Sequence, residues 1–329
     1  AFLISLAADG EIRTWDLAAL VLVQTIAPQD PHTGIGAVCL NVQHCCMVTG
    51  SRRLVLWQQL RKSATSEELT ATMLAPHGHR AALVAVLYSP QFFLVVSGDE
   101  GGLICVWDVR TGNTLFRFEH HQAKLTAMQF DCSGRRLVTG AADGVVRLWN
   151  FSSGELMYEM DGHHDKCRGD GREVTSVLHI SQGAYQYFAS VGWHREVRLS
   201  PDPSKVAQGT ANSSNAKQIQ QTRRLTGHAE DILSVAFCPP NLLATSSYDG
   251  MIIVWNLQSG AVKSRLQPLP NHGVQGLLSS RAVECLRFLD PGLMREVIVL
   301  ASCGADGSLR FWNTRLGECL LTVEGVCLP

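Results

Sequence analysis

The chain has 329 residues, enough for about two average domains, and the composition of an ordinary globular protein. Its 28 basic and 29 acidic residues give a formal net charge of −1, so it lacks the strong positive field of nucleic-acid binders and polybasic membrane binders. Hydrophobic residues make up 46% and charged residues 17%, which excludes a chain that is disordered throughout. We therefore expect a folded protein that binds neither nucleic acid nor membranes.

Eleven cysteines are scattered along the chain without paired CxxC motifs. This usage is typical of small buried residues in a reducing compartment rather than of a disulfide framework, so we expect a cytoplasmic protein. Two stretches without Asp, Glu, Lys or Arg, 81–98 and 232–248, are interrupted by Ser89-Pro90-Gln91 and Pro239-Pro240-Asn241. Each predicts two strands joined by a turn rather than a membrane helix.

The first copy of an internal repeat stands at the start of the chain. Alternating runs at 2–7, 11–17 and 21–26 predict three strands. Within them Ser5, Asp9 and Trp15 follow one another at spacings of four and six residues, with a glycine after the Asp. Because the first run begins directly after Ala1, which is not a Met, we expect the chain to be part of a longer protein.

Six further copies follow. The hydroxyl, Asp and Trp recur with the same spacing from Thr139, Thr245 and Ser302, and with losses from Ser97. A further copy has a shorter turn, and in another Ser200 stands where a Trp is expected. The Trp-equivalent positions are 15, 57, 107, 149, 200, 255 and 312.

Each copy contains about four short runs typical of strands. In the fourth copy they are 125–130, 136–140, 145–151 and 156–160. One four-stranded sheet of this size cannot bury both of its faces, whereas seven sheets arranged radially can pack face against face. The repeat therefore predicts one all-β domain over residues 1–329 instead of the two domains that the length suggests.

The pair Gly227-His228, the hydroxyl of Thr245, the turn Asp249-Gly250 and the dipeptide Trp255-Asn256 resemble the WD40 repeat. The resemblance covers essentially the whole chain and implies a seven-bladed WD40-type β-propeller. The first blade has only three evident strands, so its innermost strand should come either from residues before Ala1 or from the tail 325–329. We expect the former, because the tail is short and carries a Pro.

The resemblance also implies a structural role for the repeated polar residues. In WD40 blades a His, a hydroxyl, an Asp and a Trp form a buried chain of hydrogen bonds, which satisfies polar groups inside the sheet. Two complete sets are expected: His121, Thr139, Asp143, Trp149 and His228, Thr245, Asp249, Trp255. Partial sets, which predict less rigid blades, are Ser5, Asp9, Trp15, then His79, Ser97, Trp107 with Gly101 at the Asp position, and Ser302, Asp306, Trp312. In the fifth copy His194 occupies the Asp position.

These residues do not predict catalysis. A hydrolytic triad occurs once in an enzyme, whereas this set recurs with a Trp at fixed spacing. No two His or Cys clusters stand at zinc-ligand spacing, and no phosphate-binding glycine loop occurs. We expect no enzymatic activity, metal, cofactor or small-molecule substrate, with a propeller enzyme as the third alternative.

The expected function is a scaffold that binds proteins or peptides, because WD40 propellers mostly do so. The candidate contact residues are charged residues near the predicted turns: Arg80, Lys124, Arg195, Glu230, Asp231 and Arg281. The alternative is a substrate receptor of a cullin-RING ubiquitin ligase, because Trp107-Asp108-Val109-Arg110 fits the WDxR pattern of such receptors.

Two features are particular to this chain. Residues 190–195 resemble a Val-Gly-Trp-Asp-Arg stretch of WD-repeat proteins of cilia and axonemes, some of them linked to EF-hands, although His194 replaces the Asp. This resemblance implies a scaffold in a ciliary or cytoskeletal assembly. Segments 61–72, 162–173, 201–221 and 267–281 lengthen the repeats, and we expect surface loops there, the third open to modification at Ser204, Ser213 or Ser214.

Overall fold

The structure is a computed structural model of the whole chain. Before residue 79, side chains are described only for Glu11, Arg13, Gln24 and Thr25. The residues that the structure describes are 2–6, 11–16, 21–26, 37–41, 46–50, 54–63, 66–74, 79–89, 91–109, 111–118, 121, 123–160, 172–182, 185–204, 222–267, 281–289 and 298–323.

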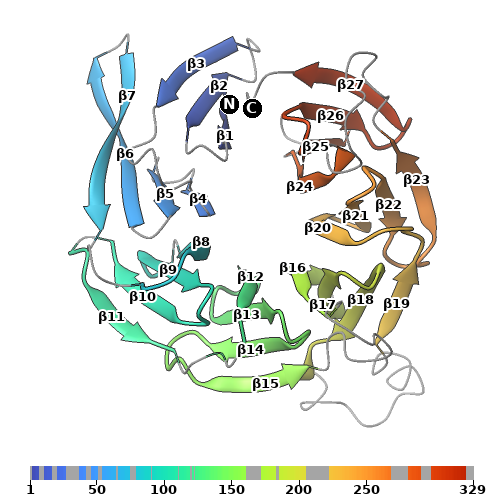
Figure 1. Cartoon of the computed structure of the whole chain (residues 1–329), viewed down its shortest axis with the longest axis horizontal. Coiled ribbons are helices and arrows are strands. Elements are labelled where there is room, and N and C mark those ends of the chain that lie inside the picture. Colours follow the sequence, from blue (N-terminus) through green and yellow to red (C-terminus); the bar gives the residue numbers. More distant parts are fainter. Residues whose placement is uncertain are drawn as a thin grey trace. The chain divides into compact units, whose positions relative to one another are not determined.

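The described elements are 27 strands in seven sheets (Figure 1). The chain forms two compact units: unit 1 comprises residues 1–128 and 149–156, and unit 2 comprises residues 129–148 and 157–329. Three sheets lie in unit 1. Their strands are β1 (Phe2–Leu6), β2 (Ile12–Asp16) and β3 (Val21–Ile26); β4 (Ala37–Asn41), β5 (Cys46–Gly50), β6 (Leu54–Ser63) and β7 (Ser66–Leu74); β8 (Leu83–Ser89), β9 (Leu94–Asp99), β10 (Ile104–Asp108) and β11 (Thr114–Arg117).

Three more sheets lie in unit 2. Their strands are β16 (Val174–Gln182), β17 (Tyr185–Gly192), β18 (Glu196–Pro201) and β19 (Arg223–Thr226); β20 (Ile232–Cys238), β21 (Leu242–Ser247), β22 (Ile252–Asn256) and β23 (Val262–Leu266); β24 (Val283–Phe288), β25 (Val299–Gly304), β26 (Leu309–Asn313) and β27 (Glu318–Val323). The remaining sheet contributes residues to both units and consists of β12 (Leu125–Phe130), β13 (Arg136–Ala141), β14 (Val146–Asn150) and β15 (Leu156–Met160).

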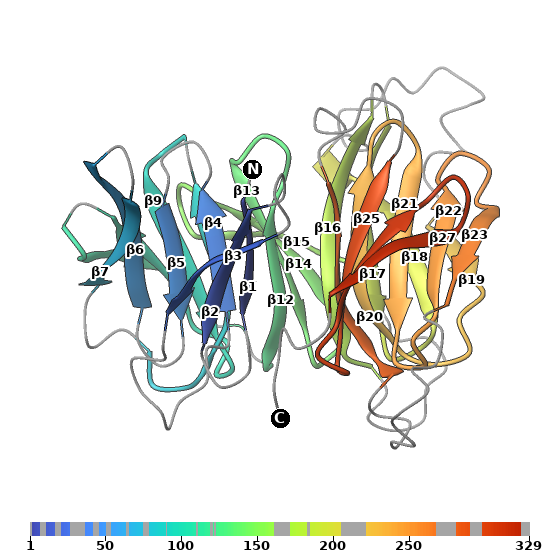
Figure 2. The ribbon, with the colours of Figure 1, turned by 90° about the horizontal axis from the view of Figure 1, so that it is seen from above.

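Within unit 2 the sheets repeat one arrangement. Each begins with a strand that contacts the first strand of the next sheet, β16 with β20 and β20 with β24. The long axes of the strands in these sheets are roughly aligned, as Figure 2 shows. Clusters of buried side chains fill the space between them: Leu199 and Ile232 belong to one cluster, and Val254 and Val283 to the next. Apolar residues on both faces of the sheets are thus buried away from water. This burial is the main source of stability in such a fold.

The register is the same from sheet to sheet. The Trp-equivalent residue on the third strand pairs with the residue two positions before the hydroxyl of the second strand. These pairs are Leu3 with Trp15, Met47 with Trp57, Val95 with Trp107, Phe188 with Ser200, Leu243 with Trp255 and Leu300 with Trp312. The repeated sequence therefore places equivalent side chains at equivalent points of successive sheets.

Several expected elements are found. The first sheet has three strands at the predicted positions, and in the fourth repeat the four predicted runs form β12 to β15. The uncharged stretches at 81–98 and 232–248 form the hairpins β8–β9 and β20–β21. In the described part of the chain, we find no helix with the length and hydrophobicity to cross a membrane.

The expectation of a surface loop at 61–72 is wrong. Residues 61–63 and 66–72 belong to the paired strands β6 and β7, in which Arg61 pairs with Glu67 and Gln59 with Leu69. The segment after Glu68 alternates Leu, Thr, Ala, Thr, Met and Leu, a pattern that favours a strand. Of the other expected loops, 162–171, 205–221 and 268–280 lie outside the described residues, as do Ser213 and Ser214.

Candidate functional site

A complete chain of buried hydrogen bonds lies in the sheet β8–β11. The Trp107 indole donates from Nε1 to Ser97 Oγ at 2.7 Å, and Ser97 Oγ lies 2.6 Å from His79 Nε2. The other ring nitrogen, His79 Nδ1, lies 2.8 Å from Asp99 Oδ2. Burial lowers the pKa of His79 although Asp99 opposes the effect. A neutral ring that accepts from Ser97 and donates from Nδ1 satisfies every group in the chain.

The expectation that the third repeat lacks the carboxylate of this set is wrong. It rested on Gly101, which stands at the Asp position of the repeat. Asp99, two residues after Ser97, supplies the carboxylate. Equivalent positions in other sheets hold small residues such as Ala141 and Gly304. Its second oxygen accepts from the Leu103 amide at 3.0 Å. This set is therefore not weakened.

In the sheet β20–β23 the chain has three members. Trp255 Nε1 donates to Thr245 Oγ1 at 2.8 Å, and His228 Nε2 lies 2.7 Å from the same oxygen. The expected link to Asp249 is absent: His228 Nδ1 has no hydrogen-bond partner among the described residues, and Asp249 Oδ1 accepts from the Met251 amide at 2.8 Å. Burial lowers the pKa of His228 to about 4, with Asp249 opposing.

The turn carboxylates of two other sheets bind arginines four residues later. Asp306 Oδ2 accepts from Arg310 at 2.5 Å, and Asp143 Oδ2 accepts from Arg147 at 2.9 Å. Trp312 Nε1 donates to Ser302 Oγ at 2.8 Å, as in the sheets above.

The other expected sets are described in part. His121, Thr139 and Trp149 are buried, and the rings of His121 and Trp149 lie 5.9 Å apart. Ser5 and Trp15 lie on β1 and β2, but their side chains and all of Asp9 lie outside the described residues.

The turns that follow the second strands also carry exposed side chains, in addition to the buried groups of the hydrogen-bond chains. The residue three positions after the hydroxyl is exposed in four of these turns. Its backbone amide donates to the carbonyl of a residue that lies just before the first strand of a sheet. These bonds run from Glu100 to Ala82, Trp193 to Glu173, Tyr248 to Asp231 and Ala305 to Ala282. The equivalence of these bonds shows that the four side chains occupy equivalent places. Two of them, Trp193 and Tyr248, are large aromatic rings 39% and 44% exposed.

We call Trp193, Arg195, Glu230, Asp231 and Tyr248 the turn surface. Arg195 lies in the turn after β17 with φ of +61° and projects toward the loop before β20. Its guanidinium lies 3.1 Å from Glu230 and 3.9 Å from Asp231. Asp231 is joined in turn to the Tyr248 amide through its carbonyl at 2.9 Å. Turns of two neighbouring sheets in unit 2 are therefore connected into one exposed surface.

The structure places the six candidate contact residues in different groups. It brings Arg195, Glu230 and Asp231 together, whereas Lys124 pairs with Glu100 at 2.9 Å in unit 1. Arg281 lies next to the turn glycine Gly250, and Arg80 is exposed before β8. Sequence reasoning did not include the exposed Trp193 and Tyr248 among the candidate contact residues. The signal was the residue before the turn Asp, which is Ala in three other repeats.

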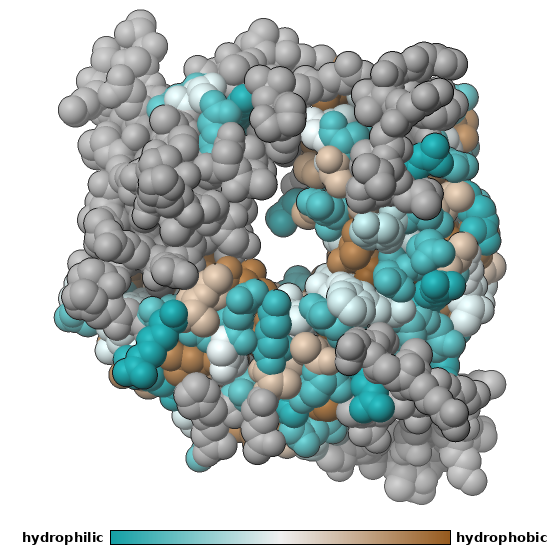
Figure 3. Space-filling view, in the orientation of Figure 1, coloured by the Kyte–Doolittle hydropathy of each residue, from teal (hydrophilic) through white to brown (hydrophobic). Residues whose placement is uncertain are grey.

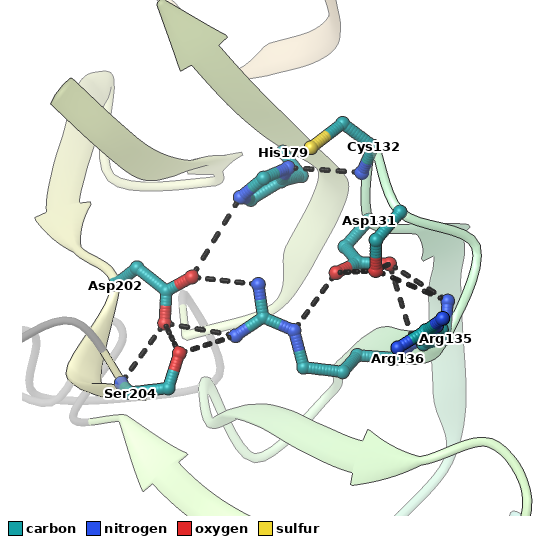
Figure 4. A network of polar contacts seen from close by, with 8 residues as sticks. Asp131, Cys132, Arg135, Arg136, His179, Asp202 and Ser204 are labelled. Atoms are coloured by element: carbon teal, nitrogen blue, oxygen red, sulfur yellow. Dashed lines mark hydrogen bonds and ion pairs between the residues drawn. The ribbon is translucent and has the colours of Figure 1, made fainter. Parts of the chain in front are cut away.

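A buried ion network among residues of unit 2 joins the sheets β12–β15 and β16–β19 on the side of the first-to-second-strand turns (Figure 4). Arg136, at the start of β13, lies between two carboxylates whose side chains are not exposed. Nε donates to Asp131 Oδ2 at 2.8 Å, and the two terminal nitrogens donate to Asp202 at 2.9 and 2.7 Å. Ser204 accepts from Arg136 at 2.7 Å and donates to Asp202 at 2.6 Å.

This network holds the start of the segment expected to be a loop at 201–221. Burial alone would raise the pKa of Asp202, but hydrogen bonds from Arg136 and Ser204 lower it below its usual value. The same balance of burial and hydrogen bonds, with Arg136 as the donor, lowers the pKa of Asp131. Both carboxylates are therefore ionised, and they share the single positive charge of Arg136.

His179 on β16 completes the network. Its Nδ1 accepts from the Cys132 amide at 3.1 Å, and its Nε2 lies 3.8 Å from Asp202 Oδ2. Burial lowers the pKa of His179, so the ring is neutral. In the described part of the chain, no group of three or more His, Cys, Asp or Glu residues is placed to hold a metal ion.

The structure describes the Trp of the WDxR match but not its Arg. Trp107 is buried in the hydrogen-bond chain of its sheet, whereas Arg110 lies outside the described residues. The match with the ligase receptors therefore stays a prediction.

Four stretches match the family model described as "WD domain, G-beta repeat" (WD40): residues 69–108, 112–150, 219–256 and 266–313. Together they make up half of the chain. The chain belongs to the WD40 family. Its all-β fold is accordingly of the WD40 β-propeller class, as the repeats predicted.

Named relatives match only parts of the chain. A "Ribosome biogenesis protein WDR12 homolog" of Drosophila mojavensis is 27% identical over 154 residues, 46% of this chain and 32% of that protein. "Protein tipD" of Dictyostelium discoideum is 30% identical over 126 residues, 38% of this chain and 18% of that protein. Human "Coronin-7" is 51% identical over 45 residues, 13% of this chain and 5% of that protein. The matched part thus spans about a third or less of each relative.

Among solved structures, the computationally designed Ika8 protein is similar to this chain with a TM-score of 0.66 and 23% identity. The similarity covers 98% of this chain and 84% of that one. At this identity the likeness shows the fold alone.

Proposed function

We propose that this WD40 chain is a non-catalytic scaffold that binds a partner protein on the turn surface. The observation that carries the proposal is the exposure of Trp193 and Tyr248 at equivalent turns, joined by the ion pairs of Arg195 with Glu230 and Asp231. Exposed aromatic and Arg side chains are the residue types that contribute most to protein interfaces. WD40 domains generally bind proteins, which is the wider support for this proposal.

The polarity of the described surface bears on how an exposed ring can be recognised. On the face that Figure 3 shows, hydrophilic residues predominate over the described part of the chain, with smaller hydrophobic areas between them. An aromatic ring within a polar surface gives a partner both apolar area and hydrogen-bonding groups at its rim.

Affinity purification with mass spectrometry tests the proposal. Replacing both Trp193 and Tyr248 by Ser removes two exposed rings that make no part of the buried hydrogen-bond chains, so we expect the fold to persist and partner recovery to fall at least tenfold. The control is Leu316→Ser, because Leu316 is 66% exposed in the same unit. Unchanged recovery with the double variant would place the binding surface elsewhere.

The same experiment addresses the other candidates. Charge reversal at Arg80 and Lys124 measures the contribution of unit 1. Recovery of a ubiquitin-ligase adaptor that is lost with Arg110→Ala would replace the scaffold proposal by that of a substrate receptor.

For the cellular setting we propose the cytoplasm, and within it a ciliary or cytoskeletal assembly. The support is the resemblance of residues 190–195 to ciliary WD-repeat proteins, which places Trp193 and Arg195 of the turn surface inside the resembling segment. The expected result is that a fluorescently tagged chain concentrates in the axoneme of ciliated cells. A diffuse or nuclear signal would refute this setting and leave the scaffold proposal standing.

A further inference from the structure

Two cysteines stand directly opposite each other in the sheet β24–β27. In the antiparallel pair of β24 and β25, Cys285 lies opposite Cys303, and both carry exposed thiols. Figure 1 shows these two strands next to each other in the sheet. Side chains that stand directly opposite in an antiparallel pair point to the same face of the sheet and are neighbours there. The two thiols therefore share one exposed face.

The equivalent positions of other sheets hold small residues without a thiol. A register shift in the first strand precedes each of these pairs, which identifies them as equivalent: Ala85 with Gly98, Ser176 with Val191 and Ser234 with Ser246. The residue on the second strand is buried in all three, and Leu125 covers Gly98. Cys303 is exposed at the same position. An oxidant in solution therefore has access to this pair.

The class of the pair sets the distance between the two residues. The Leu289 amide donates to the Val299 carbonyl at 3.0 Å, and the register continues without a shift from there to Cys285 and Cys303. Hydrogen-bonded and non-hydrogen-bonded pairs alternate along an antiparallel ladder, so Cys285 and Cys303 form a hydrogen-bonded pair with Cα atoms about 5.5 Å apart. This is also the commonest Cα separation in disulfides, about 5.5 to 6 Å.

The same pairing makes a disulfide at this position easy to reduce. Directly opposite Cβ atoms lie about 4.5 to 5.5 Å apart, at the upper end in hydrogen-bonded pairs, whereas a disulfide needs about 3.5 to 4.5 Å. Among the described strands, β24 stands at one edge of its sheet and pairs with β25. It can therefore shift toward β25, and the resulting bond is strained. Strained disulfides are the labile and regulatory ones.

We infer that Cys285 and Cys303 form a reversible disulfide when the chain meets an oxidised low-molecular-weight thiol such as glutathione disulfide. This inference concerns a modification of the chain itself and is independent of the partner protein. Disulfides of cytosolic proteins are usually transient and catalytic or redox-sensing, which agrees with the proposed cellular setting.

The reaction is a thiol–disulfide exchange in two steps. The thiolate of one cysteine attacks a sulfur of glutathione disulfide and releases one glutathione thiolate. The thiolate of the other cysteine then attacks the protein sulfur of the mixed disulfide and releases the second. Two protein thiols are oxidised, one glutathione disulfide is reduced to two glutathione molecules, and the two thiol protons pass to them.

The surroundings of Cys285 slow its part in the exchange at neutral pH. Desolvation raises the pKa of the Cys285 thiol above its usual value, Arg287 opposes the rise and Glu284 adds to it. Less thiolate is therefore present, and the thiolate is the form that attacks a disulfide. The exchange is accordingly measured at mildly alkaline pH.

The test incubates the whole chain with an excess of glutathione disulfide, blocks the remaining thiols with N-ethylmaleimide and maps the peptides by mass spectrometry without reduction. We expect a pair of peptides linked through Cys285 and Cys303, which separates on addition of dithiothreitol. Mixtures of reduced and oxidised glutathione should give half-oxidation at a ratio that the cytoplasm attains, because the strained bond is easily reduced.

The variants Cys285→Ser and Cys303→Ser each leave one thiol of the pair. The linked peptides should be lost in both, and the remaining cysteine should carry bound glutathione instead. Cys319→Ser is the matched control, because Cys319 is exposed in the same sheet but stands opposite Trp312. This variant should form the link as the unchanged chain does, and all three reduced variants should keep its melting temperature.

Two kinds of result would overturn the inference. Absence of the linked peptides, or an equal yield of links between other cysteines, would show that the pair does not close. A link that persists in the most reducing glutathione mixtures would show a permanent disulfide instead of a reversible one.

Discussion

At the scale of single residues, a Ser or Thr hydroxyl on the second strand accepts the same hydrogen bond in three sheets. Ser97, Thr245 and Ser302 each accept the hydrogen bond of a buried indole, and among the described residues the first two also contact a histidine. Sequence spacing found the hydroxyls because they recur at fixed distances from the Trp. It did not find Asp99, whose position two residues after Ser97 differs from the repeated spacing.

Replacing Ser97 by Ala should lower the free energy of unfolding by about 2 to 3 kcal/mol, because it leaves the Trp107 indole and one nitrogen of His79 buried without a partner. The matched change Ser302→Ala orphans the indole of Trp312, the side-chain partner of Ser302 among the described residues, and should cost about 1 kcal/mol. Urea denaturation of the two variants measures the difference. Equal losses would show that the histidine adds nothing to the chain of hydrogen bonds.

The buried histidines make stability depend on pH. His228 has a pKa of about 4 in the folded chain and about 6.5 when unfolded. The unfolded state therefore binds more protons between these values, and stability is complete above about pH 6.5 and falls as the pH drops toward 4. For this one residue the loss is on the order of 3 kcal/mol.

Unfolding in urea at pH 7.5 and pH 4.5 measures this loss. Replacing His228 by Gln removes the titrating group, so the variant should lose less stability between the two pH values than the unchanged chain. An identical loss would mean that other groups cause the acid sensitivity.

At the scale of elements, strands and turns were predictable because alternation of side chains and turn residues are local properties of the sequence. The strands within 61–72 were missed because residues 61–68 are mostly polar, and such a segment resembles an inserted loop until its pairing partner is known. The network of Arg136 was also beyond sequence reasoning: Arg136 and Asp202 are 66 residues apart and meet only when the two sheets pack.

Replacing Arg136 by Met should destabilise the chain by about 3 to 5 kcal/mol, because the carboxylates of Asp131 and Asp202 lose their counter-charge while they stay buried. Arg135→Met is the matched control in the same turn, since the Arg135 side chain is exposed. Thermal and urea unfolding give the comparison.

Adding Asp131→Asn and Asp202→Asn to Arg136→Met removes the unpaired charges and should recover part of the stability. Failure to recover any would indicate that packing of the long Arg side chain, rather than its charge, stabilises this junction.

At the scale of the whole molecule, the balanced charge of the sequence excluded a general attraction to nucleic acids or membranes, and the repeat identified the fold class. Neither property could identify the turn surface. Arg195 and Glu230 are 35 residues apart, and their pairing depends on which turns the sheets bring together. The surface that we propose for recognition thus consists of a few turn residues on a repeated frame.

The common register of the sheets has a consequence for how such a chain changes over time. The side chain three residues after each hydroxyl is exposed or partly exposed in five sheets and takes no part in the buried hydrogen bonds of the Trp. A mutation there alters what the surface presents while the frame stays the same. The position held by Ala305 is therefore open to acquiring a new partner, and Trp193 and Tyr248 show that large side chains fit at its equivalents.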